Sequence, residues 1–265
     1  MYARTRLSHS GSTAELREDT LTDRGVVLFI DGAEQSHVEV GDPDFLLHDY
    51  LIRFSTLLTT TAPRLFNGAP TSILHLGAGA LTLPLWVEHR WPHTRQTVVE
   101  IEPELVGFVL EHLPMRQAPE LVTGDAADVL SSERATRKFD VVVVDLFNSA
   151  AAPARVTRAA FFARVFSTLN PQGLALVNYG DDADMKFARK LTATMLSATG
   201  DPATALLSAP QETLTATDEG NLVFAHSPSG FTQQERDRVW AAGPHPHGVL
   251  TDAELLAWTR EGTHS

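Results

Sequence analysis

The chain opens with short apolar runs that are bounded by turn-forming residues. Three such runs lie within residues 13–40, separated by the turn sequences TDRG at 22–25 and DG at 31–32. Apolar and β-branched runs between turn residues are typical of antiparallel strands. The pattern predicts a β meander, which we assign to a small N-terminal β domain over residues 1–45.

Beyond residue 45 the pattern changes to helical spacing and then to alternating strands and helices. Apolar positions over 45–58 suit one buried face of a helix. Strand-like runs follow at 72–76, 96–102, 120–125, 139–147, 174–180 and 221–227. Helical patterns cover 81–89, 128–132, 157–169, 184–199 and 252–259, and a further one begins at residue 103. Alternation of this kind predicts a parallel sheet with helical crossovers. The predicted fold class is α/β, with residues 46–265 forming a Rossmann-like domain.

Composition narrows the classes of function. The 265 residues are 43% hydrophobic, carry a formal net charge of −12 and include no cysteine, which excludes disulfides, thiolate catalysis and Cys-ligated zinc. The negative charge disfavours nucleic acid and anionic membranes, because their phosphates would be repelled. No segment has the apolar length of a signal peptide or a membrane span. We therefore expect a cytoplasmic protein that binds neither nucleic acid nor membrane.

Glycines and acidic residues follow four of the strand-like runs. The carboxyl ends of parallel strands meet at one edge of a sheet, and ligands of open α/β sheets bind there. Glycines in a strand-to-helix turn let the backbone approach a ligand closely. Thr82 stands where a dinucleotide fingerprint would have its third glycine, which disfavours a nicotinamide dehydrogenase. The signals are Gly77-Ala78-Gly79 after 72–76, Glu100 after 96–99, Asp125 after 120–124 and Asp145 after 139–144.

Each of the three carboxylates has a ligand-related interpretation and a structural one. Glu100 lies 23 positions after Gly77, near the offset at which an acidic side chain accepts hydrogen bonds from ribose hydroxyls, or it is an exposed strand-end residue. Asp125 accepts from an adenine amine, with Ala126 leaving room for a flat ring, or it caps the next helix. Asp145 ends the most apolar run, where burial would raise its pKa toward that of a general base, or it caps the following loop.

Histidine spacing gives little support for a metal site. No predicted helix carries an H-x-x-x-H or H-x-E pair, and His245-Pro246-His247 lies in a predicted loop, so we expect no metal. His48 differs, because the helix over 45–58 places it either toward the cleft or toward solvent.

Taken together, these residues resemble the polyamine aminopropyltransferase family, the spermidine synthases. The resemblance runs from about residue 27 to residue 178. Its segments, in family order, are FIDGAEQ (29–35), LHD (47–49), LGAG (76–79), VEIEP (99–103), GDA (124–126), VDLFN (144–148), FF (161–162) and LNPQG (169–173).

The resemblance implies a β-rich N-terminal domain on a Rossmann-like class I S-adenosylmethionine (AdoMet) methyltransferase fold, usually as a homodimer. It implies transfer of an aminopropyl group from decarboxylated AdoMet to putrescine or another small amine. By position, Asp145 would deprotonate the attacking amine, and Asn148 and Asp49 would contact it. The residues that would hold the nucleoside and the sulfonium end are Gln35, His48, Gly77, Gly79, Glu100, Asp125 and Ala126.

Three positions depart from the family pattern. Ala80 replaces an aspartate that binds the amine of the aminopropyl arm, Leu47 replaces a tyrosine that contacts substrate, and Asn148 replaces a second aspartate. These losses leave open an AdoMet-dependent methyltransferase, or a non-catalytic binding protein on the same scaffold. They also leave open whether Asp49 or Tyr50 supplies the missing contacts.

Overall fold

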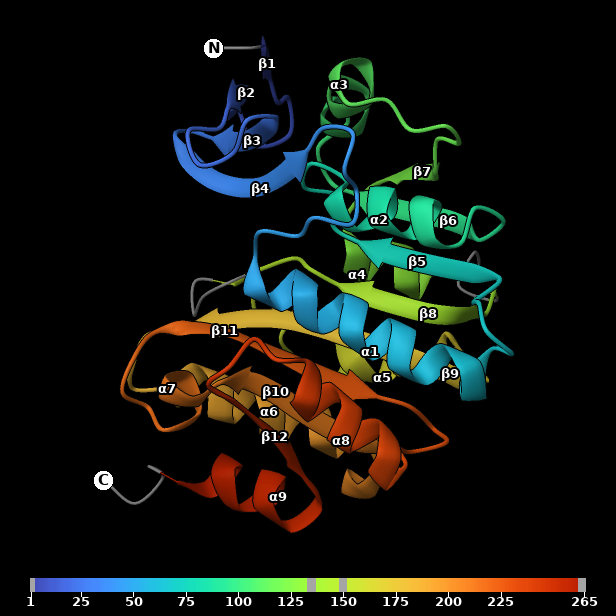
Figure 1. Cartoon of the computed structure of the whole chain (residues 1–265), viewed down its shortest axis with the longest axis vertical. Coiled ribbons are helices and arrows are strands. Elements are labelled where there is room, and N and C mark those ends of the chain that lie inside the picture. The colour runs from blue at the N-terminus through green and yellow to red at the C-terminus, as the bar shows by residue number, and fades with distance from the viewer. Residues whose placement is uncertain (1–2, 133–136, 148–151, 262–265) are drawn as a thin grey trace.

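Two β-sheets organise the described part of the chain (Figure 1). The computed structural model describes residues 3–132, 137–147 and 152–261. Within these ranges the N-terminal sheet is antiparallel, in the order β1-β2-β3-β4. Its strands are β1 (Ala3–Arg6), β2 (Thr13–Glu18), β3 (Gly25–Ile30) and β4 (Ala33–Glu39).

The second sheet is larger and mostly buried. Its strands lie in the order β12-β10-β11-β9-β8-β5-β6-β7, and those from β9 through β8, β5 and β6 to β7 are parallel. The remaining strands β11, β10 and β12 pair antiparallel at one side. The bounds are β5 (Ser72–Leu76), β6 (Arg95–Glu100), β7 (Glu120–Thr123), β8 (Phe139–Val144), β9 (Leu169–Asp181), β10 (Ala205–Pro210), β11 (Gly220–His226) and β12 (His247–Thr251).

Helices cover both faces of this sheet, which gives three layers (Figure 1). Side chains of α1, α2 and α8 pack on one face, and those of α4, α5, α6 and α9 on the other. The helices are α1 (Asp49–Leu65), α2 (Thr82–Arg90), α3 (Leu105–His112), α4 (Ala126–Ser131), α5 (Ala159–Ser167), α6 (Lys186–Thr199), α7 (Gln211–Leu214), α8 (Gln233–Ala242) and α9 (Asp252–Arg260), with a short 3-10 helix at Pro202–Thr204.

The central position of β8 follows from its composition. Val141 and Val143 pack into the core below α1 and α2, whereas Val142 and Val144 pack into the core on the opposite face. A strand that is buried on both faces needs apolar residues at every position, and only an interior strand of a covered parallel sheet has that environment. The α/β class with a Rossmann-like sheet is confirmed.

The N-terminal sheet lies against the carboxyl edge of the large sheet. Leu16, Leu28 and Val38 form one apolar cluster with Leu81 and Val109, so the small sheet packs on the glycine-containing loop after β5 and on α3. This packing brings β4 over the edge at which the sequence places its candidate site.

Several elements differ from the sequence prediction. Strands β1, β10 and β12 and helices α7 and α8 were not predicted, and α1 begins at Asp49 instead of residue 45. The segment 169–173, predicted to end a helix, opens the long strand β9. A bulge in the β8–β9 pairing lets this segment join the ladder.

Candidate active site

A cavity of about 510 Å³ lies at the carboxyl ends of β5, β6, β7 and β8. This volume is within the range of small-molecule sites. β4, the residues around the start of α1, β9 and β11 complete the walls. The cavity brings together these sequence-predicted residues: Gln35, His48, Gly77, Gly79, Glu100, Asp125, Ala126 and Asp145.

Gly77 makes the close approach of two strand ends sterically feasible. Its φ is +98°, and a Cβ at this position would lie 2.2 Å from the backbone oxygen of Asp145. Its N–H donates to the carbonyl of Val99 at 2.9 Å. Glycine here therefore serves the packing of backbone on backbone beneath the cavity.

Gly79 makes room for a side chain of the N-terminal sheet. A Cβ on Gly79 would lie 2.4 Å from Oγ of Ser36 on β4. That hydroxyl accepts a hydrogen bond from the N–H of Ala80 at 3.1 Å. The loop after β5 is therefore held from above by β4, and Ala80, where the family carries an aspartate, is fully buried.

Glu100 braces the same loop from the end of β6. Its Oε2 accepts from the N–H of Ala78 at 3.0 Å, and its Oε1 accepts from the N–H of Glu102 at 2.9 Å. Burial raises the pKa of Glu100, while these backbone donors act in the opposite direction. Each carboxylate oxygen has a second lone pair that can accept from a ligand hydroxyl.

Asp125 is the N-cap of α4. Its Oδ1 accepts from the N–H of Ala127 at 2.8 Å, and its Oδ2 forms an ion pair with Arg155 at 3.2 Å. The helix-cap interpretation of the sequence is therefore realised in the structure. Asp125 and the neighbouring Ala126 also line the cavity.

Asp145 is held from two sides. Its Oδ2 accepts from the hydroxyl of Tyr50 at 3.1 Å, and its Oδ1 accepts from Nδ2 of Asn178 at 2.9 Å. Burial raises the pKa of Asp145, and both hydrogen bonds act against that rise. Burial also raises the pKa of Tyr50 well above its ordinary value, so the hydroxyl keeps its proton and remains a donor.

His48 lies beside this pair, at the N-cap of α1. Its ring stacks on Tyr50 with centroids 6.0 Å apart, and its Nε2 lies 3.7 Å from Oε1 of Glu34. Burial lowers the pKa of His48, which favours a neutral ring. Nε2 is buried without a hydrogen-bond partner among the described residues, so a ligand can fill that position.

Of the two residues expected to contact the amine, only Asp49 belongs to the described residues. Asp49 is not among the described residues that line the cavity, and its Oδ2 accepts from Nη2 of Arg53 at 2.9 Å. Arg53 is only 1% exposed and donates from Nη1 to Ser208 at 2.9 Å, while Nη1 lies 2.5 Å from Nδ1 of His247. Asn148 lies outside the described residues.

Tyr50 and Asn178, the two hydrogen-bond partners of Asp145, were not assigned to the site by the sequence. Tyr50 was one of two alternatives on a helix whose phase the sequence left open. Asn178 had a signal, because it is a single amide in the apolar run LALVNYG at 174–180. A buried amide in a strand needs partners, and here one partner is Asp145.

The turn between β1 and β2 forms part of the cavity roof. Leu7, Ser10 and Ser12 line the cavity. Glu102 accepts from the backbone N–H of His9 at 3.2 Å and of Ser10 at 3.0 Å. Glu102 therefore connects the roof to the loop after β6.

The cavity is strongly anionic. No Lys or Arg occurs among the described residues that line it. Arg155 pairs with Asp125, and the other carboxylates of the lining favour a cationic ligand over an anion. The carboxylates in its lining are Glu34, Glu100, Glu102, Asp125 and Asp145.

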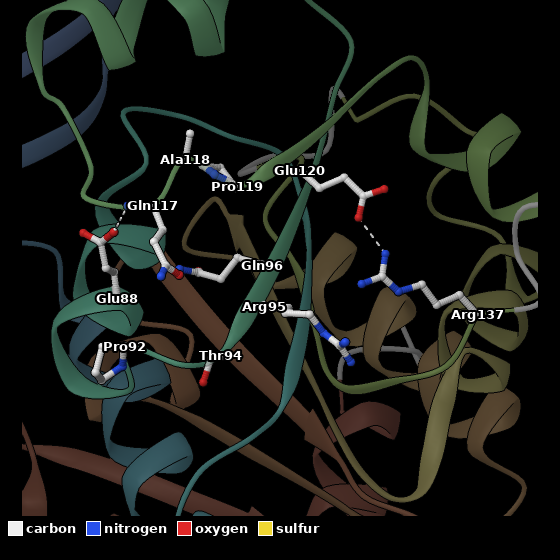
Figure 2. A pocket seen from close by; sticks show the side chains of 10 residues that line it. All are labelled: Glu88, Pro92, Thr94, Arg95, Gln96, Gln117, Ala118, Pro119, Glu120 and Arg137. Carbon is white, nitrogen blue, oxygen red and sulfur yellow. Dashed lines mark hydrogen bonds and ion pairs between the residues drawn. The ribbon is translucent and has the colours of Figure 1, made fainter.

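A second hollow lies at the opposite, amino-terminal ends of β6 and β7 (Figure 2). It measures about 220 Å³, and Figure 2 shows the ion pair between Glu120 and Arg137, whose nearest atoms are 2.6 Å apart. Glu88 is engaged by the backbone N–H groups of Arg116 and Gln117. These polar groups already satisfy one another, and ligands of open α/β sheets bind at the other edge.

Two further features limit the chemistry. In the described part of the chain, no group of three or more His, Asp or Glu side chains is arranged to hold a metal ion. Within the same residues, no helix combines the length and apolarity needed to cross a membrane.

Comparison with known proteins gives the same architecture. No protein-family model matches the chain. A polyamine aminopropyltransferase of Neisseria meningitidis is 28% identical over 133 residues, covering 48% of this chain and 50% of the relative. The chain thus spans about half the length of the curated relatives it matches.

Solved structures extend the similarity over nearly the whole chain. A probable spermidine synthase from Corynebacterium glutamicum has a TM-score of 0.86 at 24% identity, covering 98% of this chain and 94% of its own. Human methyltransferase-like protein 13, in complex with SAH, has a TM-score of 0.56 at 18% identity, covering 80% of this chain and 90% of its own.

The fold is that of the class I AdoMet-dependent methyltransferases, carrying a small N-terminal β-sheet. The segment that aligns in sequence is similar to polyamine aminopropyltransferases, at 28% identity to one relative and 24% to another.

Proposed function

We propose that the protein transfers an aminopropyl group from decarboxylated AdoMet to an amine. The observation that carries the proposal is the setting of Asp145, a buried carboxylate hydrogen-bonded by Tyr50 and Asn178, in a cavity lined by carboxylates. By resemblance to the family, the enzyme would act as a cytoplasmic homodimer.

Asp145 would serve as the general base. An ammonium has no lone pair, so the acceptor must lose a proton before its nitrogen can attack. The nitrogen then attacks the propyl carbon next to the sulfonium, the N–C bond forms, and the C–S bond breaks with its electron pair going to sulfur. Asp145 takes the proton, and methylthioadenosine leaves. The raised pKa of Asp145 suits this role.

The other end of the cavity would hold the nucleoside. Glu100 and Asp125 offer free lone pairs to the ribose hydroxyls and the adenine amine, with Ala126 against the ring. Gln35 and His48, which both line the cavity, would hold the sulfonium end. Gly77 and Gly79 also line the cavity and would lie beside the sugar.

The charge of the cavity supports the decarboxylated donor. The carboxylate of AdoMet would enter a cavity whose described lining holds no Lys or Arg and whose histidine, His48, has a lowered pKa. The donor without that carboxylate carries only positive charge, which the carboxylates of the lining attract.

One observation favours methyl transfer from AdoMet as a second candidate. Ala80 is fully buried where the family carries the aspartate that binds the amine of the aminopropyl arm. Without that carboxylate, nothing at this position repels the carboxylate of AdoMet. The same experiment distinguishes the two reactions.

The test is incubation of the purified protein with AdoMet or with decarboxylated AdoMet and a panel of amines, followed by mass analysis. Methylthioadenosine together with an aminopropylated amine supports the proposal, whereas S-adenosylhomocysteine supports methyl transfer. The Asp145→Asn variant should lose transfer by a factor of about 10² or more and still bind methylthioadenosine. Full activity of this variant would remove the base role.

A further inference from the structure

We infer that the acceptor carries a single amine on a neutral or apolar body, and that it is not a diamine. The inference rests on the proposed function and deepens it. It comes from the composition of the cavity on the far side of Asp145.

The strand order divides the cavity into two parts. Asp145 follows β8, which lies between β5 and β9. The strands β5, β6 and β7 carry the loop with Gly77 together with Glu100 and Asp125. On the other side, β9 contributes Asn178 and β11 contributes Asn221. We call this second part, at the ends of β9 and β11, the acceptor part.

Strand register places both amides on the same face. Asn178 and Gly180 are two apart on β9, so they share a face of the sheet, and Asn221 pairs directly with Gly180. Asp181 has the opposite parity and points to the other face, where it accepts from the N–H of Ala188 at 2.8 Å. The described residues of β9 and β11 that line the cavity are Asn178 and Asn221, and neither carries a carboxylate.

The amide of Asn178 is oriented to receive one amine. Asp145, when ionised, can only accept hydrogen bonds, so the NH₂ group of Asn178 faces it and Oδ1 points away. Asn178 is 3% exposed, and Oδ1 is buried with no hydrogen-bond partner among the described residues. An N–H of an amine bound at Asp145 would satisfy this oxygen.

Beyond this amine position the walls are apolar or neutral. Leu146 and Phe147, which directly follow Asp145 in the chain, line the cavity, as does the amide of Asn221. The remaining nearby carboxylate, Glu34, belongs to the N-terminal sheet, faces His48 at 3.7 Å and is 46% exposed in its side chain. Water screens an exposed carboxylate of this kind, so it binds a cation weakly.

A diamine would therefore leave its second ammonium poorly compensated. One ammonium would meet Asp145, and the other would lose its hydration among amides and apolar side chains. Transfer of a charge from water without an ionic partner is costly, whereas a methyl group in the same place gains from burial.

The experiment compares two acceptors of equal chain length, n-butylamine and putrescine, with decarboxylated AdoMet as donor. We expect kcat/KM for n-butylamine to exceed that for putrescine by about tenfold or more. A preference for putrescine in the unmodified protein would overturn the inference and leave the proposed function intact.

A charge variant tests the acceptor part directly. Asn221→Asp adds a carboxylate there, and kcat/KM for putrescine relative to n-butylamine should rise by about tenfold. Asn67→Asp is the matched control, because it adds the same charge at an exposed position after α1. An unchanged ratio in Asn221→Asp, with its unfolding transition unaltered, would contradict the assignment.

Different results would overturn the proposed function and the proposed acceptor class. Methylthioadenosine binding measured by calorimetry reports on the nucleoside part alone. Binding without transfer to any amine would overturn the proposed function, and with it the acceptor class. Transfer with putrescine preferred would overturn only the acceptor class.

Discussion

Tyr50 and Asn178 oppose the effect of burial on Asp145. Each donates to one oxygen of the carboxylate, which stabilises the ionised form, whereas the apolar surroundings destabilise it. The balance of these effects sets the pH range over which Asp145 can accept a proton. Tyr50 acts here as a positioning residue.

The variant Tyr50→Phe tests this balance. Loss of the hydroxyl removes a donor to the charged form, so the pKa of Asp145 should rise further. The acidic limb of the profile of kcat/KM against pH should move upward by about one pH unit. An unshifted limb with lowered kcat would assign Tyr50 to substrate contact instead.

At this scale the sequence identified residue types better than side-chain directions. Glu100, Asp125 and Asp145 each follow a strand of the parallel sheet. The carboxyl ends of parallel strands lie at the same edge, so these three residues were predictable as a group. Asp49 and Tyr50 are adjacent on a helix, where a change of one position turns a side chain by about 100°. Asp49 accepts a hydrogen bond from Arg53, which is itself held by Ser208 and His247. These partners are distant in the sequence, so the direction of Asp49 was not predictable.

At the scale of elements, the turn after β5 sets the geometry of the whole edge. The backbone of Gly77 packs against the carbonyl oxygen of Asp145. The N–H of Asp145 donates to the carbonyl of Leu76 at 2.9 Å. The turn therefore couples the strand that carries the glycines to the strand that carries the proposed base.

Gly77→Ala should destabilise the protein by about 3 kcal/mol or more, because a Cβ meets backbone and the φ of +98° is unfavourable for alanine. Gly107→Ala in helix α3 is the matched control, because no described atom lies within 4 Å of its added Cβ. This variant should raise the free energy of unfolding by about 0.5–1 kcal/mol. Urea unfolding of both variants measures the difference, and equal stabilities would contradict the steric argument.

The elements that the sequence missed share a cause. Strands β10 and β12 pair antiparallel at the side of the sheet, and their sequences ALLSAP and HGVLT lack both alternation and a long apolar run. They are held in place by tertiary contacts, among them the guanidinium of Arg53 with Ser208 on β10 and His247 on β12. Short segments stabilised mainly by distant partners carry little local signal.

At the scale of the whole molecule, buried neutral histidines link folding to pH. His75 is 2% exposed and His226 is 4% exposed, and burial lowers the pKa of each to about 4. The unfolded chain takes up protons on these side chains near pH 6.5, whereas the folded protein does so only near pH 4. Their contribution to stability is therefore present above pH 6.5 and is lost as the pH falls toward 4.

Urea unfolding at several values between pH 7.5 and pH 4.5 should show a falling free energy of unfolding. The variant His75→Gln, which cannot take up a proton, should have a shallower slope than the unmodified protein. Identical slopes would show that folding does not lower the pKa of His75.

The attachment of the β1–β2 turn has a practical consequence. Glu102 and Glu104 accept hydrogen bonds from the backbone N–H groups of this turn, at Ser8, His9 and Ser10. The side chains of Ser8 and His9 are exposed. Since main-chain amides are common to every residue except proline, the identity of these two side chains is free to change. A cysteine placed at position 9 in this cysteine-free chain would carry a single fluorescent dye beside Ser10, which lines the cavity, and would report when a ligand arrives.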